Sequence, residues 1–278
     1  MIMKKDVNRE HLKNNFLKNI IVRFDYTGIA EVELDTIIAE VKPIFKSAGY
    51  TKLREEYLTE MDFELQDPEN IEIEGLPIKE IRKKKAYVFA NEKKDIECKI
   101  STRFALVSIQ NHKYIPFAEY SETLFEVVKT LINKVEFLNC IRFGIRKVNQ
   151  CIMKDISKIN EYFETDFYNL YGLKKGNKPK IFETKDCFKE EKYNFNLTRM
   201  VVGGEYEESV AYQVILDTDI YITEASDINE LFSDTSEINI MNEKLFEVYK
   251  SAITKEFIEK LGMDNYNDQN IIGVEKNE

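Results

Sequence analysis

Apolar residues spaced three and four positions apart predict two long amphipathic helices in this chain. The first stripe consists of Leu124, Val128, Leu131, Val135 and Leu138, and the second of Leu245, Val248, Ala252 and Leu261. Ser121 and Asn242 stand at the start of the two segments, and both residue types accept hydrogen bonds from unpaired helical amides. We therefore expect the two helices to begin at these residues.

The two helical segments are also similar in sequence. Residues 121–130 read Ser-Glu-Thr-Leu-Phe-Glu-Val-Val-Lys-Thr, and residues 242–251 read Asn-Glu-Lys-Leu-Phe-Glu-Val-Tyr-Lys-Ser. A second match, Ile-Val-Arg-Phe at 21–24 and Cys-Ile-Arg-Phe at 140–143, lies at nearly the same offset. Two matches in the same order predict a duplicated unit of roughly 120 residues, whereas the alternative is coincidence among residues common in helices.

Alternating apolar and polar residues predict the strands between the helices. In the first half the expected strands are residues 19–26, 51–65, 86–90, 95–101 and 103–110, with a helix at about 34–48 that Pro43 should kink or break. In the second half they are residues 140–152, 194–202 and 207–223, with a short helix at about 155–165 and a turn at Gly203-Gly204. We expect an irregular Lys-rich insertion at about 166–192 and disorder in the polar tail.

Both halves therefore read strand, helix, several strands, helix, an order that predicts an α+β fold. The expected units are residues 1–138 and 139–264, followed by the polar tail at 265–278. This order resembles the tandem units of the TATA-binding-protein-like fold. The resemblance implies two strand–helix–multi-strand–helix units that form one curved antiparallel sheet with helices on one face.

Composition and charge narrow the function classes. The chain has 278 residues, is 43% hydrophobic and carries a formal net charge of −10, which disfavours broad non-specific binding to nucleic acid. No apolar run is long enough to cross a membrane, and the N-terminus lacks a secretory signal, so we expect a cytoplasmic protein without a membrane partner. None of the four cysteines forms a Cys-x-x-Cys pair, and structural disulfides are not expected in that compartment.

Three motifs resemble a known family. Residues 138–149, Leu-Asn-Cys-Ile-Arg-Phe-Gly-Ile-Arg-Lys-Val-Asn, are similar to an Arg-Ile-Gly-Leu-Arg-Tyr-Ile-Asn strand, although Cys-Ile-Arg-Phe replaces the usual start. Residues 216–221 are similar to a Leu-Asp-Ile-Asp-Val-Tyr strand, and residues 242–261 to a C-terminal helix. In this order they resemble a sporadically distributed prokaryotic family of roughly 250-residue uncharacterised proteins. The resemblance implies an accessory protein encoded near mobile-element or phage-defence genes, with no catalytic residues to transfer.

Arginines on the predicted central strands are the sharpest candidates for a binding site. Alternate residues of a strand share a face, so Arg142, Gly144 and Arg146 should point away from the helices. If the two equivalent strands are central, Arg23 joins them on the helix-free face. Guanidinium groups bind phosphate or carboxylate bidentately, so this face is a candidate anion site. The alternative is that these arginines pair with neighbouring carboxylates.

Two aspartates and one asparagine complete the candidate ligand-binding set. Asp217 and Asp219 share a strand face, where they could bind a metal or perform acid–base chemistry, or could simply pair with nearby arginines. Asn149 ends the family-like strand motif. Phosphate-loop and nucleophile-elbow motifs are missing, and the two histidines lack metal-ligand spacing. We therefore predict no catalytic residue, no metal site and no cofactor from the sequence.

Two basic runs could contact nucleic acid or an acidic protein. The candidates are Arg82, Lys83, Lys84, Lys85, Lys174 and Lys175. Acidic residues flank both runs, so solvated loops are the alternative. We expect a non-enzymatic binding protein with a protein partner or a second copy of itself, in a prokaryotic defence or mobile-element system. A nucleic-acid-binding protein is the first alternative, although net charge disfavours it, and a metal-dependent hydrolase or nuclease is the second.

Overall fold

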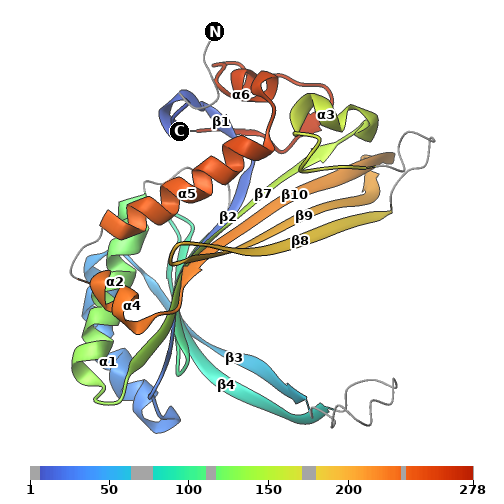
Figure 1. Ribbon diagram of the computed structural model, residues 1–278. Coiled ribbons are helices and arrows are strands. Elements are labelled where there is room, and N and C mark those ends of the chain that lie inside the picture. Colours follow the sequence, from blue (N-terminus) through green and yellow to red (C-terminus); the bar gives the residue numbers. More distant parts are fainter. Residues whose placement is uncertain (1–6, 64–77, 111–116, 171–179, 233–235, 278) are drawn as a thin grey trace.

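The computed structural model describes residues 7–63, 78–110, 117–170, 180–232 and 236–277. Figure 1 shows one large curved sheet with the helices gathered on one side of it, and both chain ends at the same end of the molecule. The first half contains η2 (Arg9–His11), β1 (Asn14–Asn15), β2 (Leu17–Thr27), α1 (Glu31–Ser47), β3 (Lys52–Phe63), β4 (Ile78–Asn91), β5 (Ile96–Ser101), β6 (Phe104–Gln110) and α2 (Phe117–Lys134). The second half contains β7 (Asn139–Met153), η3 (Ile156–Lys158), α3 (Ile159–Tyr162), β8 (Ile181–Glu190), β9 (Tyr193–Tyr206), β10 (Ser209–Ile222), α4 (Ala225–Glu230), α5 (Ser236–Ala252), α6 (Lys255–Leu261), β11 (Ile271–Ile272) and β12 (Glu275–Lys276).

The fold is α+β, as expected, with an antiparallel sheet in the order β3-β4-β5-β6-β2-β7-β10-β9-β8. The two strands that carry the repeated Arg-Phe motif, β2 and β7, are neighbours at its centre. Each is flanked on its other side by the last strand of the meander that follows it in sequence, β6 or β10. This order is compatible with tandem units, and the duplication itself stays a prediction.

The hydrophobic core lies between the sheet and the helices. On β2 and β7, alternate residues point into it, and the side chains of Val22, Phe24, Phe143 and Ile145 are fully buried. Phe24 lies at the centre, with its ring centroid 4.6 Å from that of Phe143 and 5.1 Å from that of Phe125 on α2. The alternation that assigns the arginines to the opposite face is therefore confirmed.

A second core cluster lies at the end of the sheet near the chain termini. It combines Val7, Leu12 and Phe16 with residues of β7, β9, β10, α5 and α6. The N-terminal segment thus packs with the second half of the chain, and β1 pairs with β12. The predicted boundary at residue 138 does not divide these packing clusters.

Both long helices begin before their predicted start. Ser121 lies inside α2, where its hydroxyl donates to the carbonyl of Phe117 at 2.9 Å, and Asn242 lies inside α5. The prediction that the helices begin at Ser121 and Asn242 was therefore wrong. The apolar stripe shows where the repeated segment lies, but it does not show where the helix begins. Helix α1 continues through Pro43 to Ser47 without a break.

The second half differs from the prediction in four further places. Residues 181–190 of the expected irregular insertion form the edge strand β8, and residues 225–230 form the short helix α4, where no helix was predicted. The β9–β10 turn is at Glu207 and Glu208, since Gly203 and Gly204 lie inside β9 and pair with β10. The tail is ordered up to residue 277, because β11 pairs with β7 and Ile271 is buried.

Candidate functional site

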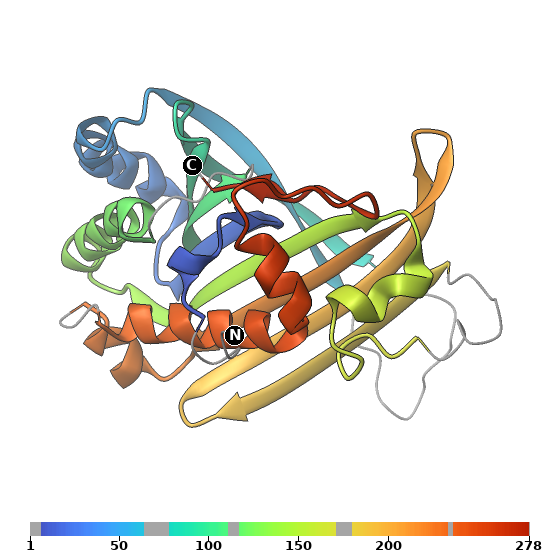
Figure 2. The same cartoon turned by 90° about the horizontal axis from the view of Figure 1, so that it is seen from above.

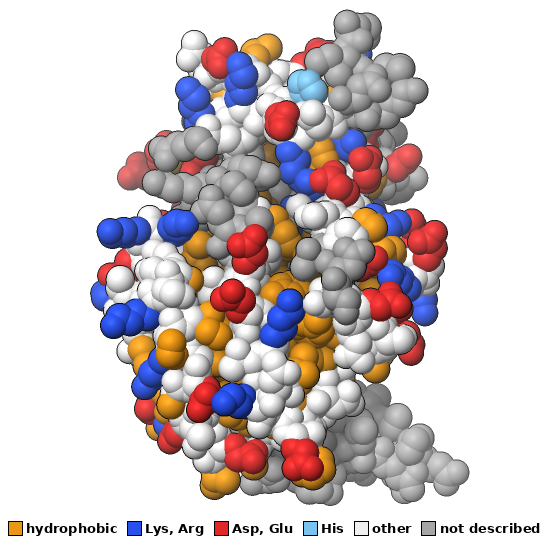
Figure 3. Space-filling view, turned by 90° about the vertical axis from the view of Figure 1, so that its left-hand side faces the viewer, with side chains coloured by type: hydrophobic (Ala, Val, Ile, Leu, Met, Phe, Trp, Pro, Cys, Tyr) orange, Lys and Arg blue, Asp and Glu red, His pale blue; other side chains and the backbone are white. Residues whose placement is uncertain are grey.

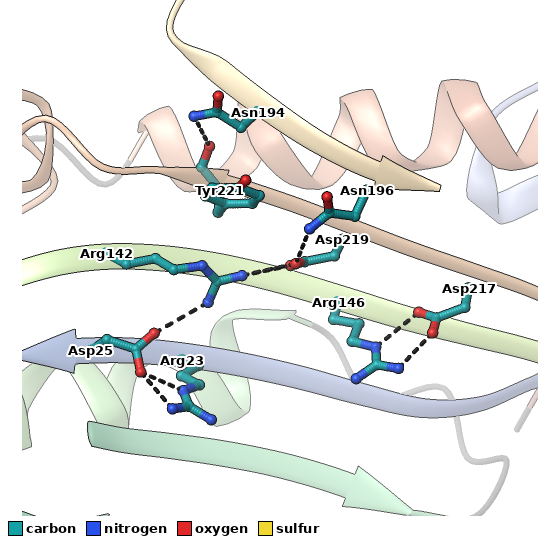
Figure 4. Close-up of polar contacts among 9 residues, drawn as sticks. All are labelled: Arg23, Asp25, Arg142, Arg146, Asn194, Asn196, Asp217, Asp219 and Tyr221. Carbon is teal, nitrogen blue, oxygen red and sulfur yellow. Dashed lines mark hydrogen bonds and ion pairs between the residues drawn. The ribbon is translucent and has the colours of Figure 1, made fainter. Parts of the chain in front are cut away.

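The predicted arginines and aspartates meet on the side of the sheet that carries no helix. We call this side the open face and define its centre by Arg23, Asp25, Arg142, Arg146, Asp217 and Asp219. Figure 4 shows these side chains on the three neighbouring strands β2, β7 and β10. The period-two alternation of each strand places them together, as the sequence predicts.

Arg142 links all three strands. Its Nη2 donates to both carboxylate oxygens of Asp219, at 2.8 and 3.0 Å, and its Nη1 donates to Asp25 at 3.3 Å. The guanidinium carbon also lies 4.5 Å from the ring centroid of Tyr221. Asn196 on β9 donates to the far side of the network, from its Nδ2 to Asp219 at 3.3 Å. Arg142 therefore connects strands on both sides of β7 by charge-assisted hydrogen bonds.

Gly144 makes this arrangement possible. The Arg142 side chain runs along β7 over Gly144, and a Cβ at that position would lie 2.9 Å from Nη2 and 3.0 Å from Cζ. Any side chain there would therefore displace the guanidinium. Asp219 is paired in register with Arg146, so Arg142 reaches it diagonally across the strand pair.

The other two arginines are also neutralised. Arg146 donates to both oxygens of Asp217, at 2.8 and 2.5 Å, and this carboxylate raises the pKa of Arg146 above its ordinary value. Arg23 donates through Nε to Asp25 at 2.7 Å and lies over the ring of Phe104 at 4.2 Å. Three arginines thus pair with three aspartates. These contacts agree with the alternative stated above, in which the arginines pair with neighbouring carboxylates.

A second ion-pair network lies further out on the open face, across β3, β4 and β5. Arg54 contacts Glu97 at 2.9 Å and Glu56 at 3.0 Å, and Lys99 contacts Glu56 at 2.5 Å. Val88 on β4 lies between them, because it is in register with Arg54 on β3 and with Lys99 on β5, and its side chain is fully buried. Sequence reasoning missed this network, although the Arg-x-Glu spacing at 54–56 and the Glu-x-Lys spacing at 97–99 mark one strand face each.

The remaining predicted site residues lie elsewhere. Asn149 is on the helix-covered face, is 4% exposed, and donates to the carbonyl of Leu216 at 3.5 Å. The predicted basic loop at 82–85 is part of strand β4, where Lys84 pairs with Glu31 and Lys85 with Asp35 of α1. Lys83 is exposed. Lys174 and Lys175 lie outside the described residues.

The open face presents its central charges as arginine–aspartate ion pairs. Asp217 and Asp219 both bond to arginines, and within the described ranges no group of three His, Cys, Asp or Glu side chains could bind a metal ion. In the same part of the chain, no helix is long and apolar enough to cross a membrane.

Comparison with known proteins does not assign the chain to a family. No family model matches the chain, and no curated protein matches it.

Proposed function

We propose that this chain is a non-enzymatic binding protein that recognises a protein partner through the open face of its sheet. The observation that carries the proposal is the pairing of all five cations described above, Arg23, Arg54, Lys99, Arg142 and Arg146, with carboxylates on the same face. Partly exposed apolar side chains lie between these pairs, namely Ile21, Leu106, Val148, Met200 and Ile215. A protein–protein interface as a whole is about as apolar as the rest of a protein surface, so a mixed face of this kind can serve as one.

Nucleic-acid binding, the alternative function, has less support. Affinity for a phosphate backbone comes from cations that displace condensed counterions, and a cation already paired with a carboxylate contributes less to that exchange. Figure 3 views the helix-covered side, where basic and acidic side chains intermingle over the coloured residues without a large basic patch. The net charge of −10 acts in the same direction.

A metal-dependent hydrolase has the weakest support. Asp217 and Asp219 would have to release their arginines before either could bind a metal ion. On the strength of the resemblance to a prokaryotic accessory family, we propose that the partner belongs to a phage-defence or mobile-element system.

Affinity capture from the native host tests the proposal. Ile215→Glu adds a charge to the open face, and Ile240→Glu, on an exposed position of α5, is the matched control. We expect Ile215→Glu to lose the captured partner, or a self-associated species in size-exclusion chromatography, while Ile240→Glu retains it. Equal capture by both variants would contradict the proposal. Retention of the purified chain on an oligonucleotide column at moderate salt would favour the nucleic-acid alternative.

A further inference from the structure

A small cavity lies on the opposite side of the sheet from the open face, between α5, the central strands and the N-terminal segment. Figure 2 shows that segment beside α5 and above β7. The cavity volume is about 70 Å³, and its apolar walls include Leu12, Leu245 and Phe246. Its polar lining includes Arg9, Lys147 and Tyr249. The lining also includes Asn15, Asn149, Thr218 and Asn277, and its two charged residues, Arg9 and Lys147, are both basic, which favours an anion.

Lys147 is the central polar group of this cavity. It follows Arg146 on β7 and therefore points to the helix-covered side, where its Nζ donates to Asn242 Oδ1 at 2.6 Å. Removal from water and, to a smaller extent, the charge of Arg9 lower the pKa of Lys147 to about 7, while Glu243 acts against both. Near pH 7 the protonated and neutral forms of this amine are therefore about equally populated.

Tyr249 supplies the second, independent observation. Its side chain lines the cavity from α5 and is 8% exposed. Its hydroxyl is buried and has no hydrogen-bond partner among the described residues. A buried hydroxyl without a partner is unfavourable, and a ligand oxygen that accepts its hydrogen bond would relieve that cost.

Arg9 completes the cationic wall. It pairs with Glu243, donates to the carbonyl of Asn242 at 2.5 Å and lies over the ring of Phe246 at 4.7 Å. These contacts fix the guanidinium at the cavity. With Lys147 protonated, the two cations exceed the single carboxylate of Glu243 by one positive charge.

We propose that this cavity binds a small aliphatic monocarboxylate, with its carboxylate toward Lys147 and the Tyr249 hydroxyl and its alkyl chain against Leu12 and Leu245. A water-sized position needs about 10–15 Å³ on this volume scale, so the cavity accommodates about five to seven non-hydrogen atoms. Butanoate and pentanoate have this size. The site is separate from the open face, so it goes beyond the proposed function and its failure would leave that function untested.

Binding should be coupled to protonation of Lys147. The charged groups that act on it are Arg9 from the N-terminal segment and Glu243 from α5, and Tyr249 of α5 lines the same cavity. An anion stabilises the ammonium form, so affinity should be highest below pH 7 and should fall by about tenfold per pH unit above it. Arg9 keeps its charge throughout this range.

Isothermal titration calorimetry with butanoate and pentanoate tests the site, with butanamide as the neutral analogue. We expect Lys147→Met to weaken butanoate binding about tenfold or more, Tyr249→Phe to weaken it about threefold or more, and butanamide to bind at least about tenfold more weakly than butanoate. Lys129→Met, an exposed position on α2, is the matched control and should bind as the wild type does.

Absence of binding by either acid would overturn the proposal, as would equal binding by the wild type and both cavity variants. Circular dichroism of each variant reports whether it folds. If Lys147→Met does not fold, the pH dependence of the wild type decides, and an affinity that is flat between pH 6 and about pH 9 overturns the proposal.

Discussion

Replacement of Gly144 by alanine tests whether Arg142 depends on the missing side chain at this position. Both glycines Gly144 and Gly204 lie inside strands of the same sheet. A Cβ at Gly144 would lie 2.9 Å from Arg142 Nη2, whereas a Cβ at Gly204 would meet nothing within 4 Å. Gly204→Ala is therefore a matched control for the change in backbone freedom.

The magnitude follows from two opposing contributions. Replacing glycine in a strand by alanine stabilises the fold by about 0.5–1 kcal/mol when the backbone tolerates it. Displacing Arg142 weakens its bonds to Asp219 and its contact with Tyr221. The side chains of Arg142 and Asp219 are 26% and 15% exposed, between the surface and buried extremes, so we take this loss as about 1–2 kcal/mol. We expect Gly144→Ala to be less stable than Gly204→Ala by about that amount.

Urea unfolding followed by tyrosine fluorescence measures the difference, because the chain has 15 tyrosines and no tryptophan. In an Arg142→Ala background the obstacle is gone, and Gly144→Ala should then stabilise the fold as Gly204→Ala does. Equal stability of the two alanine variants in the wild-type background would refute the proposed dependence of Arg142 on Gly144.

Three further predictions concern other parts of the chain. The pKa of Lys147 is about 7 in the folded state against about 10.4 in the unfolded state, so the unfolded state binds more protons between these values. Wild-type stability relative to Lys147→Met should therefore rise from pH 7 to about pH 9 in urea titrations, and a constant difference would contradict this. Glu207 and Glu208 both have positive φ angles, 49° and 61°. Replacing them by Asn-Gly should therefore raise the free energy of unfolding by about 1–2 kcal/mol. A lower free energy of unfolding would show that these two residues do not adopt positive φ angles at the turn. In thiol titration with a disulfide reagent, the exposed Cys187 should react first. The other three thiols should react only when the protein unfolds, because burial raises their pKa. Four thiols that react equally fast in the folded protein would refute this prediction.

The alternation of apolar and polar residues was sufficient to predict which side chains share a sheet face. In β2, β7 and β10 this period places Arg23, Arg142, Arg146, Asp217 and Asp219 together on the open face. It could not predict the pairs, because Arg142 bonds diagonally to Asp219 over Gly144. That choice depends on strand register and on the space above a glycine, and neither is local in sequence.

The missed elements lack a local signal for a physical reason. Most residues of the edge strand β8 are exposed, so its sequence shows no apolar period. Gly203 and Gly204 are a stronger turn signal than Glu207 and Glu208, yet β9 continues through the glycines because pairing with β10 compensates their flexibility. Asparagine is a common helix cap, but Asn242 lies within α5, where its side chain accepts a hydrogen bond from Lys147.

The ion pairs on the open face also restrict how the central strands can pair. A shift of β7 by one residue would turn Arg142 and Arg146 into the apolar core and bring Phe143 and Ile145 to the surface. A shift by two residues would keep the faces, and in the direction that brings Arg146 opposite Tyr221 it would separate Arg146 from Asp217. The hydrophobic pattern alone excludes only the first of these, since its period is two residues. Bidentate pairs at defined positions therefore oppose the two-residue shift in that direction, which the apolar core does not, and they give the open face a structural role that does not depend on any partner.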